Sequence, residues 1–230
     1  MDLKKLPKVA YFCMEYGLNE KFPIYAGGLG ILAGDILKAA FDLKLPLVGI
    51  GILWEHGYTS QVISHEGWPE DRPQKVDRKY LVDTNKKIKV TIAGREITCK
   101  IWLCEAFNNV PLYLLEPENY PYVCHSLYCG SEEDRVKQEI ILGIGGVRAL
   151  NALGIKPDLY HFNEGHAVLA GLELINQKMS KGLSFPEAWE QTKDQIVFTT
   201  HTPVMAGNEI HAPELLMHLG ANLNLDLEQL

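Results

Sequence analysis

Apolar residues recur along this chain with two alternating spacings. Residues 9–12 and 47–53 form short continuous apolar runs, which are typical of strands covered on both faces of a sheet, and a further strand is expected at 159–162. Between the two runs, residues 29–43 carry an apolar residue at every third or fourth position, which predicts one face of a helix. Strands separated by helices require crossover connections. The pattern therefore predicts an α/β protein with a Rossmann-like, mostly parallel sheet and flanking helices.

The middle of the chain adds variations to this pattern. Polar and apolar residues alternate over 86–101, which predicts an antiparallel hairpin inserted into the fold. Residues 132–153 have the periodicity of one long helix. Residues 55–80 contain two glycines and two prolines at turn-like positions, so a long loop is expected there. Further strands are expected at 111–115 and 196–200, and further helices at 165–179 and 185–192.

Composition and charge place the chain among folded globular proteins. Its 230 residues are 47% hydrophobic and 22% charged, enough for one large domain without disulfides or a structural metal. The five cysteines are an odd number, so reduced, buried thiols and a cytoplasmic location are expected. The net charge of −7 disfavours nucleic acid and anionic membranes as partners, and no apolar stretch is long enough to span a bilayer.

Three segments with useful chemistry follow predicted strands, where ligands gather in parallel sheets. Residues 25–34 form a glycine-rich turn opening a helix, so either a phosphate-binding loop or a purely structural turn fits them. Residues 163–166 form a polar loop, and no metal is expected there because His161 and His166 are badly spaced for one helix face. Residues 198–207 end a strand with two hydroxyls and His201, which favours this histidine as a pocket residue.

A dinucleotide site is the rival interpretation of the glycine-rich turn. Gly28, Gly30 and Gly34 loosely match the corresponding fingerprint, and Glu55 lies at about the right distance for a ribose contact. The fingerprint begins directly at its strand end, however, whereas residues 19–23 separate this turn from the first strand. No serine-hydrolase elbow, Walker A lysine or H-E-x-x-H motif occurs, which disfavours those enzyme classes.

Four blocks together resemble the α-glucan (glycogen, starch or maltodextrin) phosphorylases, in particular their short bacterial and archaeal branch. The blocks are the first strand with its Gly-Gly-Leu-Gly loop, residues 49–61, the long helix of residues 135–148, and the two loops of residues 161–166 and 200–207. The resemblance covers nearly the whole chain. It implies that residues 1–230 form the N-terminal half of a two-domain GT-B glycosyltransferase, whose cleft separates two Rossmann-like halves.

This resemblance also implies an activity. Such enzymes transfer terminal α-1,4-linked glucosyl units of a glucan to phosphate and release glucose 1-phosphate. Pyridoxal phosphate, held by a lysine of the second half, takes part in the reaction. Nothing in this chain resembles that second half, so the partner expected for it is a C-terminal half, in cis or as a second polypeptide, without which the chain is inactive.

The resemblance assigns roles to particular residues. His201 is implied as the catalytic residue, which contacts the glucosyl unit and stabilises its developing positive charge. Met205 and Asn208 depart from the usual loop after this histidine, which puts some contacts of that loop in doubt. Backbone N–H groups of the glycine-rich loop are implied to approach phosphate, at Gly27, Gly28, Leu29 and Gly30. The implied substrate-binding residues are Asn163, Glu164, His166, Thr202 and Glu15.

Two alternatives to a phosphorylase stay open. Glycogen and starch synthases share the architecture and a Gly-Gly-Leu-Gly loop, but they normally carry a lysine where Tyr25 stands here, so a nucleotide sugar is disfavoured as substrate. A non-catalytic glucan-binding subunit is the second alternative, because a chain of this length falls short of a two-half catalytic unit.

Overall fold

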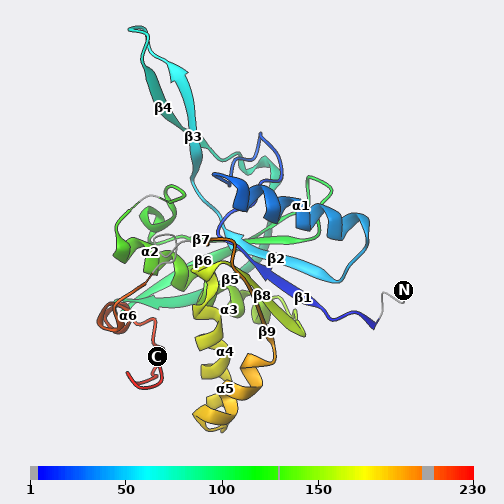
Figure 1. The fold of residues 1–230 in the computed structure, drawn as a ribbon, viewed down its shortest axis with the longest axis vertical. Helices are drawn as coiled ribbons and strands as arrows, with labels where there is room; N and C mark the ends of the chain where they lie inside the picture. Colours follow the sequence, from blue (N-terminus) through cyan, green and yellow to red (C-terminus); the bar gives the residue numbers. More distant parts are fainter. Residues whose placement is uncertain (1–4, 129, 204–209) are drawn as a thin grey trace.

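The structure, a computed structural model, describes residues 5–128, 130–203 and 210–230. Within them a seven-stranded sheet has the order β5-β6-β7-β2-β1-β8-β9 (Figure 1). The five strands from β7 to β9 are parallel to one another. They are β1 (Val9–Phe12), β2 (Leu47–Ile52), β7 (Leu112–Pro117), β8 (Leu159–Asn163) and β9 (Ile196–Thr199). The predicted α/β fold with a mostly parallel sheet is confirmed.

The direction in which the chain fills the sheet reverses at its centre. From β1 it proceeds through β2 to β7 on one side, and it then returns to place β8 and β9 on the other side of β1. Phe12 of β1 pairs with Phe162 of β8, so the carboxyl ends of these two strands lie side by side. Such a switch point leaves a crevice beyond the strand ends, which is where open α/β sheets bind ligands.

An antiparallel hairpin extends the sheet, as the alternating pattern predicts. It consists of β5 (Val82–Ile92) and β6 (Arg95–Cys104), and β6 pairs antiparallel with β7. The turn residues Ala93 and Gly94 both have positive φ, 49° and 73°. Positive φ at both central residues belongs to the tight turn whose twist matches that of paired strands.

One long helix packs directly on the centre of the sheet. It runs from α2 (Glu132–Glu139) through a π-helical segment, η4 (Ile140–Gly145), into α3 (Gly146–Ala152). A Cβ on Gly146 would lie 2.5 Å from Phe12 Cε1 and 2.7 Å from Ile50 Cγ2, so only glycine allows the helix this close to β1 and β2. The glycines of this helix therefore serve packing, as expected from the sequence.

The remaining helices are shorter and complete the crossover connections. Helix α1 joins β1 to β2, and α4 and α5 lie between β8 and β9. Helix α6 follows β9, and its Leu219 carbonyl accepts a hydrogen bond from Ala93 N in the β5–β6 turn. The bounds are α1 (Gly28–Asp42), α4 (Leu169–Met179), α5 (Phe185–Lys193) and α6 (Pro213–Leu219), with short 3-10 turns η2 (Arg78–Tyr80), η3 (Pro121–Cys124) and η5 (Gly165–Ala167).

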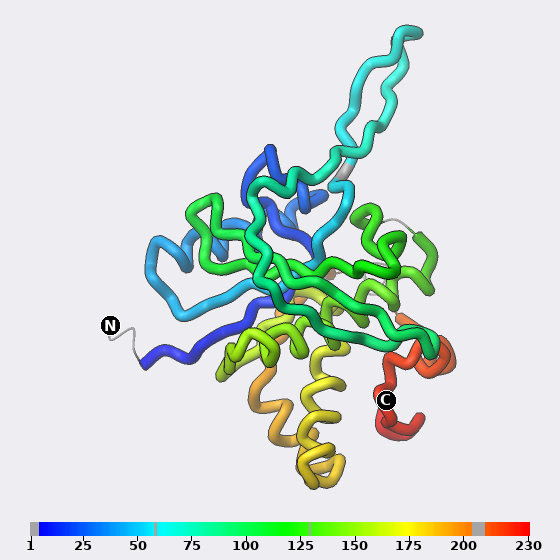
Figure 2. Tube along the Cα trace, turned by 180° about the vertical axis from the view of Figure 1, so that it is seen from behind, coloured from blue at the N-terminus to red at the C-terminus, as the bar shows by residue number. Residues whose placement is uncertain are grey.

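The expectation of a long loop over residues 55–80 is wrong. Strands β3 (His56–Ile63) and β4 (Pro69–Lys75) form an antiparallel ribbon that projects away from the body (Figures 1 and 2). Prolines are tolerated in β4 because a two-stranded ribbon has open outer edges, where a missing N–H removes no ladder bond. The ribbon has no sheet face to bury, so it shows no apolar alternation, and Trp68 near its turn is 69% exposed.

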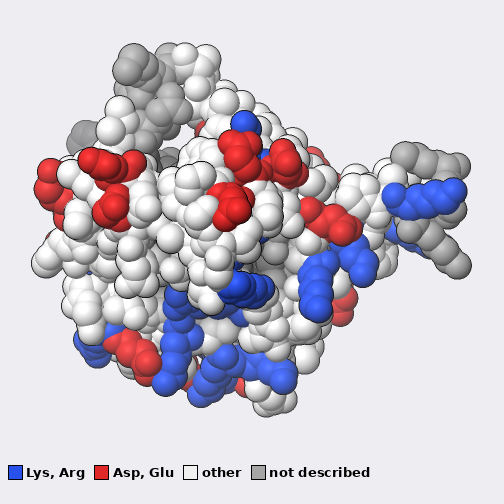
Figure 3. Space-filling view, turned by 90° about the horizontal axis from the view of Figure 1, so that it is seen from below, with Lys and Arg blue, Asp and Glu red and all other residues white. Residues whose placement is uncertain are grey.

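Burial agrees with the expectation for the four described cysteines, and Cys129 lies outside the described residues. Cys13, Cys99, Cys104 and Cys124 are free and buried, and burial raises the pKa of the Cys99 thiol to about 12. On the face drawn in Figure 3, acidic side chains lie mainly in the upper part and basic side chains mainly in the lower part, and in places the two adjoin. In the described part of the chain, no helix combines the length and apolar character needed to cross a bilayer.

Candidate active site

A cavity of about 760 Å³ opens at the carboxyl ends of the central strands. Its walls come from the N-terminus of α1, from the loop after β8 and from the loop after β9. The central helix and the segment before α6 add further residues. The described lining residues are Gly28, Leu29, Leu32, Tyr128, Glu139, Glu164, Gly165, His166, Val168, Phe198, His201, Thr202 and His211.

The glycine-rich turn places an uncapped helix end at this cavity. Gly27, the N-cap of α1, has an extended backbone and offers no side chain to the first turn. The N–H groups of the first turn have no acceptor within the helix, and a Cβ added to Gly28 would meet nothing within 4 Å. Open N–H groups at the positive end of a helix form a suitable site for a phosphate.

A buried carboxylate holds this turn in place. Glu15 is 2% exposed, and its Oε2 accepts hydrogen bonds from Ala26 N at 2.6 Å and Gly27 N at 3.2 Å. Its Oε1 accepts a bond from Tyr128 Oη at 2.6 Å. Burial and the Glu15 charge raise the pKa of the Tyr128 phenol, which therefore stays a donor. A Cβ on Gly30 would lie 2.6 Å from Glu15 Oε2, so a glycine is required behind the clamp.

A second glutamate organises the loop after β9. The Glu164 carboxylate accepts hydrogen bonds from His201 N at 2.5 Å, Thr200 Oγ1 at 3.2 Å and Thr202 Oγ1 at 3.3 Å. Glu164 itself has φ of 63° and ψ of 179°, a combination that is rare outside glycine. Strained backbone of this kind persists where surrounding contacts impose it, and it concentrates at functional sites. Here it aims a carboxylate at the turn that carries His201.

The His201 ring is held by a chain of hydrogen bonds that reaches into the core. His201 Nε2 lies 3.1 Å from Asn163 Oδ1, and Asn163 Nδ2 donates to Tyr11 Oη at 2.7 Å. With its amide nitrogen directed at Tyr11, Asn163 can only accept at Oδ1, so His201 Nε2 carries a proton and Nδ1 is the acceptor of the neutral ring. Burial raises the pKa of the Tyr11 phenol, which keeps this chain uncharged at its inner end.

Comparison with known proteins identifies relatives of this chain. The chain matches no family model. It is 44% identical over 216 residues to a maltodextrin phosphorylase of Thermococcus litoralis, which covers 87% of this chain and 26% of that protein. It is 40% identical over 220 residues to a glycogen phosphorylase of Mycobacterium tuberculosis, with 86% of this chain and 25% of that protein covered. The chain is a homologue of the α-glucan phosphorylases.

The lengths of these relatives differ greatly from that of the chain. An uncharacterized protein of Methanocaldococcus jannaschii is 37% identical over 233 residues, covering 95% of this chain and 42% of that protein. The chain thus spans about a quarter of the length of the two phosphorylases.

In this phosphorylase homologue the predicted residues fall into two groups. The lining of the cavity includes Gly28, Leu29, Glu164, His166, His201 and Thr202. The residues Glu15, Gly27, Gly30 and Asn163 lie behind the lining and hold it through the contacts described above. Met205 and Asn208 lie outside the described residues.

Sequence reasoning missed three polar residues of the cavity, which are Tyr128, Glu139 and His211. His211 Nε2 lies 3.3 Å from Glu139 Oε2, and the Glu139 side chain is only 3% exposed. Each of the three comes from a different segment, so no local spacing relates them. Of the three, only Glu139 could have been noticed in the sequence, because this acidic residue directly precedes the apolar stretch of the long helix.

Proposed function

We propose that this chain supplies one half of an α-glucan phosphorylase active site. The complete site transfers a terminal α-1,4-linked glucosyl unit to phosphate and forms glucose 1-phosphate. The observation that carries the proposal is the cavity itself, in which an uncapped helix N-terminus and a firmly held histidine meet at the switch point of the sheet. The homology to phosphorylases supports the same reaction.

Each wall of the cavity has a distinct task in this proposal. The N–H groups of Gly28 and Leu29 bind phosphate oxygens at the positive end of α1. His201 contacts the glucosyl unit, while His166 and Thr202 line the sugar site. The Glu164 carboxylate, hydrogen bonded to the His201 turn, adds negative potential where the glucosyl unit develops positive charge. Fixed charges of this kind lower a barrier because they are oriented before the reaction starts.

Pyridoxal phosphate is assigned to the other half of the enzyme. Among the described lining residues of the cavity there is no lysine, so the lysine that holds the cofactor has to come from elsewhere. The open first turn of α1 fits a phosphate group. When bound, the cofactor supplies a phosphate group that acts on the substrate phosphate.

The rim of the cavity supports the need for a second half. Leu32, Val168 and Phe198 line the cavity and remain exposed, although each is large and apolar. Apolar side chains gathered at one site mark a surface that another surface covers. We assign this cover to a C-terminal half, in cis or on a second polypeptide.

A chimera tests the proposal. The chain replaces the matching 216 residues of the Thermococcus litoralis maltodextrin phosphorylase, and glucose 1-phosphate is measured with maltodextrin and phosphate as substrates. We expect the chimera to be active and the isolated chain to bind maltodextrin weakly without turnover. His201→Asn should lower the rate of the chimera by about 100-fold or more, whereas His218→Gln, on the exposed face of α6, should not change it.

Other outcomes decide between the alternatives. Glucose 1-phosphate formation by the isolated chain would show that no second half is needed. Release of ADP or UDP from a nucleotide sugar would establish a synthase instead. A folded chimera, checked by circular dichroism, that binds glucan and forms neither product would establish a non-catalytic glucan-binding subunit.

A further inference from the structure

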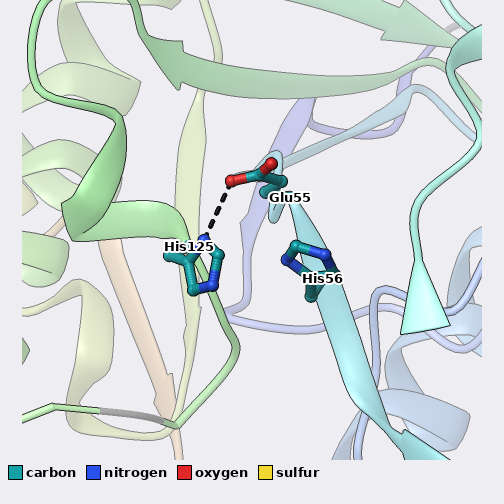
Figure 4. A group of neighbouring side chains, drawn as sticks. All are labelled: Glu55, His56 and His125. Atoms are coloured by element: carbon teal, nitrogen blue, oxygen red, sulfur yellow. Dashed lines mark hydrogen bonds and ion pairs between the residues drawn. The ribbon is translucent and has the colours of Figure 1, made fainter. Parts of the chain in front are cut away.

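A group of titratable side chains lies apart from the cavity, at the base of the β3–β4 ribbon. It consists of Glu55, His56 and His125 (Figure 4). One carboxylate oxygen and one ring nitrogen from each histidine all lie within 4.8 Å of one another. His125 Nδ1 is 2.9 Å from Glu55 Oε2, and the centroids of the two imidazole rings are 4.7 Å apart. The proposed phosphorylase reaction uses none of these residues.

The backbone brings the three residues together independently of their side chains. Glu55 N donates to Cys124 O at 3.0 Å, and His56 N donates to His125 O at 2.9 Å. Val76 N, directly after β4, donates to Glu55 O at 3.0 Å. These bonds connect the start of the ribbon, its end and the segment after η3. The three side chains therefore converge on scaffold that is already in place, which is what a binding site for an ion requires.

The side chains are also in a suitable state for an ion. His56 Nδ1 is buried and has no hydrogen-bond partner in the described part of the chain. A buried polar atom without a partner is unfavourable, so an additional partner at this ring would be favourable.

We propose that Glu55, His56 and His125 bind a divalent transition metal ion, with Zn²⁺ as the best match. Two imidazoles and one carboxylate are a donor set that zinc accepts, whereas Mg²⁺ and Ca²⁺ prefer oxygen ligands. Ligands of a tetrahedral zinc ion lie about 3.3 Å apart. Atoms that lie within 4.8 Å of one another thus need to approach by at most about 1.5 Å. Glu55 and His125 have room to turn because their side chains are 43% and 56% exposed.

The position of this site indicates what the ion does. A two-stranded ribbon is marginally stable by itself in water, and the ion would tie its base to the segment after η3. Glu55 and His125 also line a cavity of about 470 Å³, so a fourth ligand such as water can enter from that side. The ion would therefore stabilise the ribbon and leave the cavity of the candidate active site unchanged.

Zinc titration of the untagged 230-residue chain tests the site. After removal of metal with EDTA, the chain competes for Zn²⁺ with a colorimetric chelator. We expect one ion per chain, and Glu55→Gln and His56→Gln should each weaken binding about tenfold or more, since even indirect partners of metal ligands contribute that much. His65→Gln, at the exposed turn of the same ribbon, is the matched control and should bind as tightly as the unchanged chain.

A second measurement needs no variant and covers the case in which a substitution prevents folding. With Co²⁺ in place of Zn²⁺, the ring protons of His56 and His125 should show large paramagnetic NMR shifts. Equal Zn²⁺ affinity of the chain and all its variants would overturn the proposal. Paramagnetic shifts at His161 and His201 in place of His56 and His125 would overturn it as well. Because neither measurement uses glucan or phosphate, failure here is distinguishable from failure of the proposed reaction.

Discussion

The neighbouring strands β1 and β2 each have a glutamate three residues beyond their end, and the two glutamates have opposite surroundings. Glu15, after β1, is 2% exposed and accepts hydrogen bonds from two backbone N–H groups and a phenol. The Glu55 side chain, after β2, is 43% exposed and contacts one histidine. The same residue type is therefore a permanent structural clamp at one strand end and an accessible ligand at the other.

The difference follows from where the chain goes after each strand. Both strands are interior to the sheet, but after β1 the chain stays on the body and forms the turn that opens α1, which packs over Glu15. A carboxylate there has to be satisfied by fixed donors, because burying an unpaired charge is very unfavourable. After β2 the chain leaves the body to form the β3–β4 ribbon, where water reaches the side chain (Figure 1).

The largest expected effect is on stability when each glutamate is replaced by alanine. Glu15→Ala should lower the free energy of unfolding by about 3 kcal/mol or more, because it leaves buried donors of a charged acceptor unpaired. Glu55→Ala should change it by less than about 1 kcal/mol, as is typical of an exposed polar contact. Urea unfolding in the presence of EDTA measures both. Equal losses for the two variants would remove the distinction between clamp and ligand.

A pair of glycine substitutions in the first turn of α1 sharpens the role of the Glu15 clamp. A Cβ on Gly30 would lie 2.5 Å from Tyr25 Cβ and 2.6 Å from Glu15 Oε2. Gly30→Ala should therefore destabilise the fold by about 1–3 kcal/mol. A Cβ on Gly28 meets nothing, so Gly28→Ala should stay within about 0.5 kcal/mol while it weakens phosphate binding at the cavity.

Thermal unfolding and a phosphate titration of both glycine variants provide the readouts. Both substitutions lie in the same helical turn, so helix propensity changes alike in the two. Equal stability of Gly28→Ala and Gly30→Ala would mean that the clamp does not require the close approach of Gly30.

The smallest expected effect is the dependence of folding stability on pH, which extends the comparison from glutamates to histidines. Burial lowers the pKa of His161 below its usual 6.5, and the nearby His201 lowers it further. The unfolded chain therefore binds a proton at this residue more readily than the folded one. The resulting contribution to stability is complete above pH 6.5 and is lost as the pH falls through that value and below.

An NMR titration of the ring protons measures this pKa directly, with the exposed His218 as the internal control. A His161 pKa at or above its usual 6.5 would contradict the expectation. Replacement of His161 by phenylalanine, which keeps a ring beside Tyr11, should flatten the decline of stability on acidification.

The local pattern of apolar residues was sufficient to predict much of the fold and part of the candidate site. Apolar runs located β1 and β2, and the three- and four-residue spacing located α1, because burial on a sheet or along a helix face imposes those periods. The β3–β4 ribbon was not predicted, because it buries no face and its residues therefore follow neither period. Proline and glycine within it then favoured a loop, although an isolated ribbon tolerates both.

By itself, the sequence determined most of the order of strands and helices outside the ribbon, the glycine-rich turn and the histidine-bearing loop, because each depends on neighbours within one element. Only the tertiary structure decided which distant residues these segments contact. Glu15 holds its turn together with Tyr128, 113 residues away. Glu55 meets His125 across 70 residues. Such pairs depend on which strands lie side by side in the sheet, and that arrangement is set by packing of the whole chain.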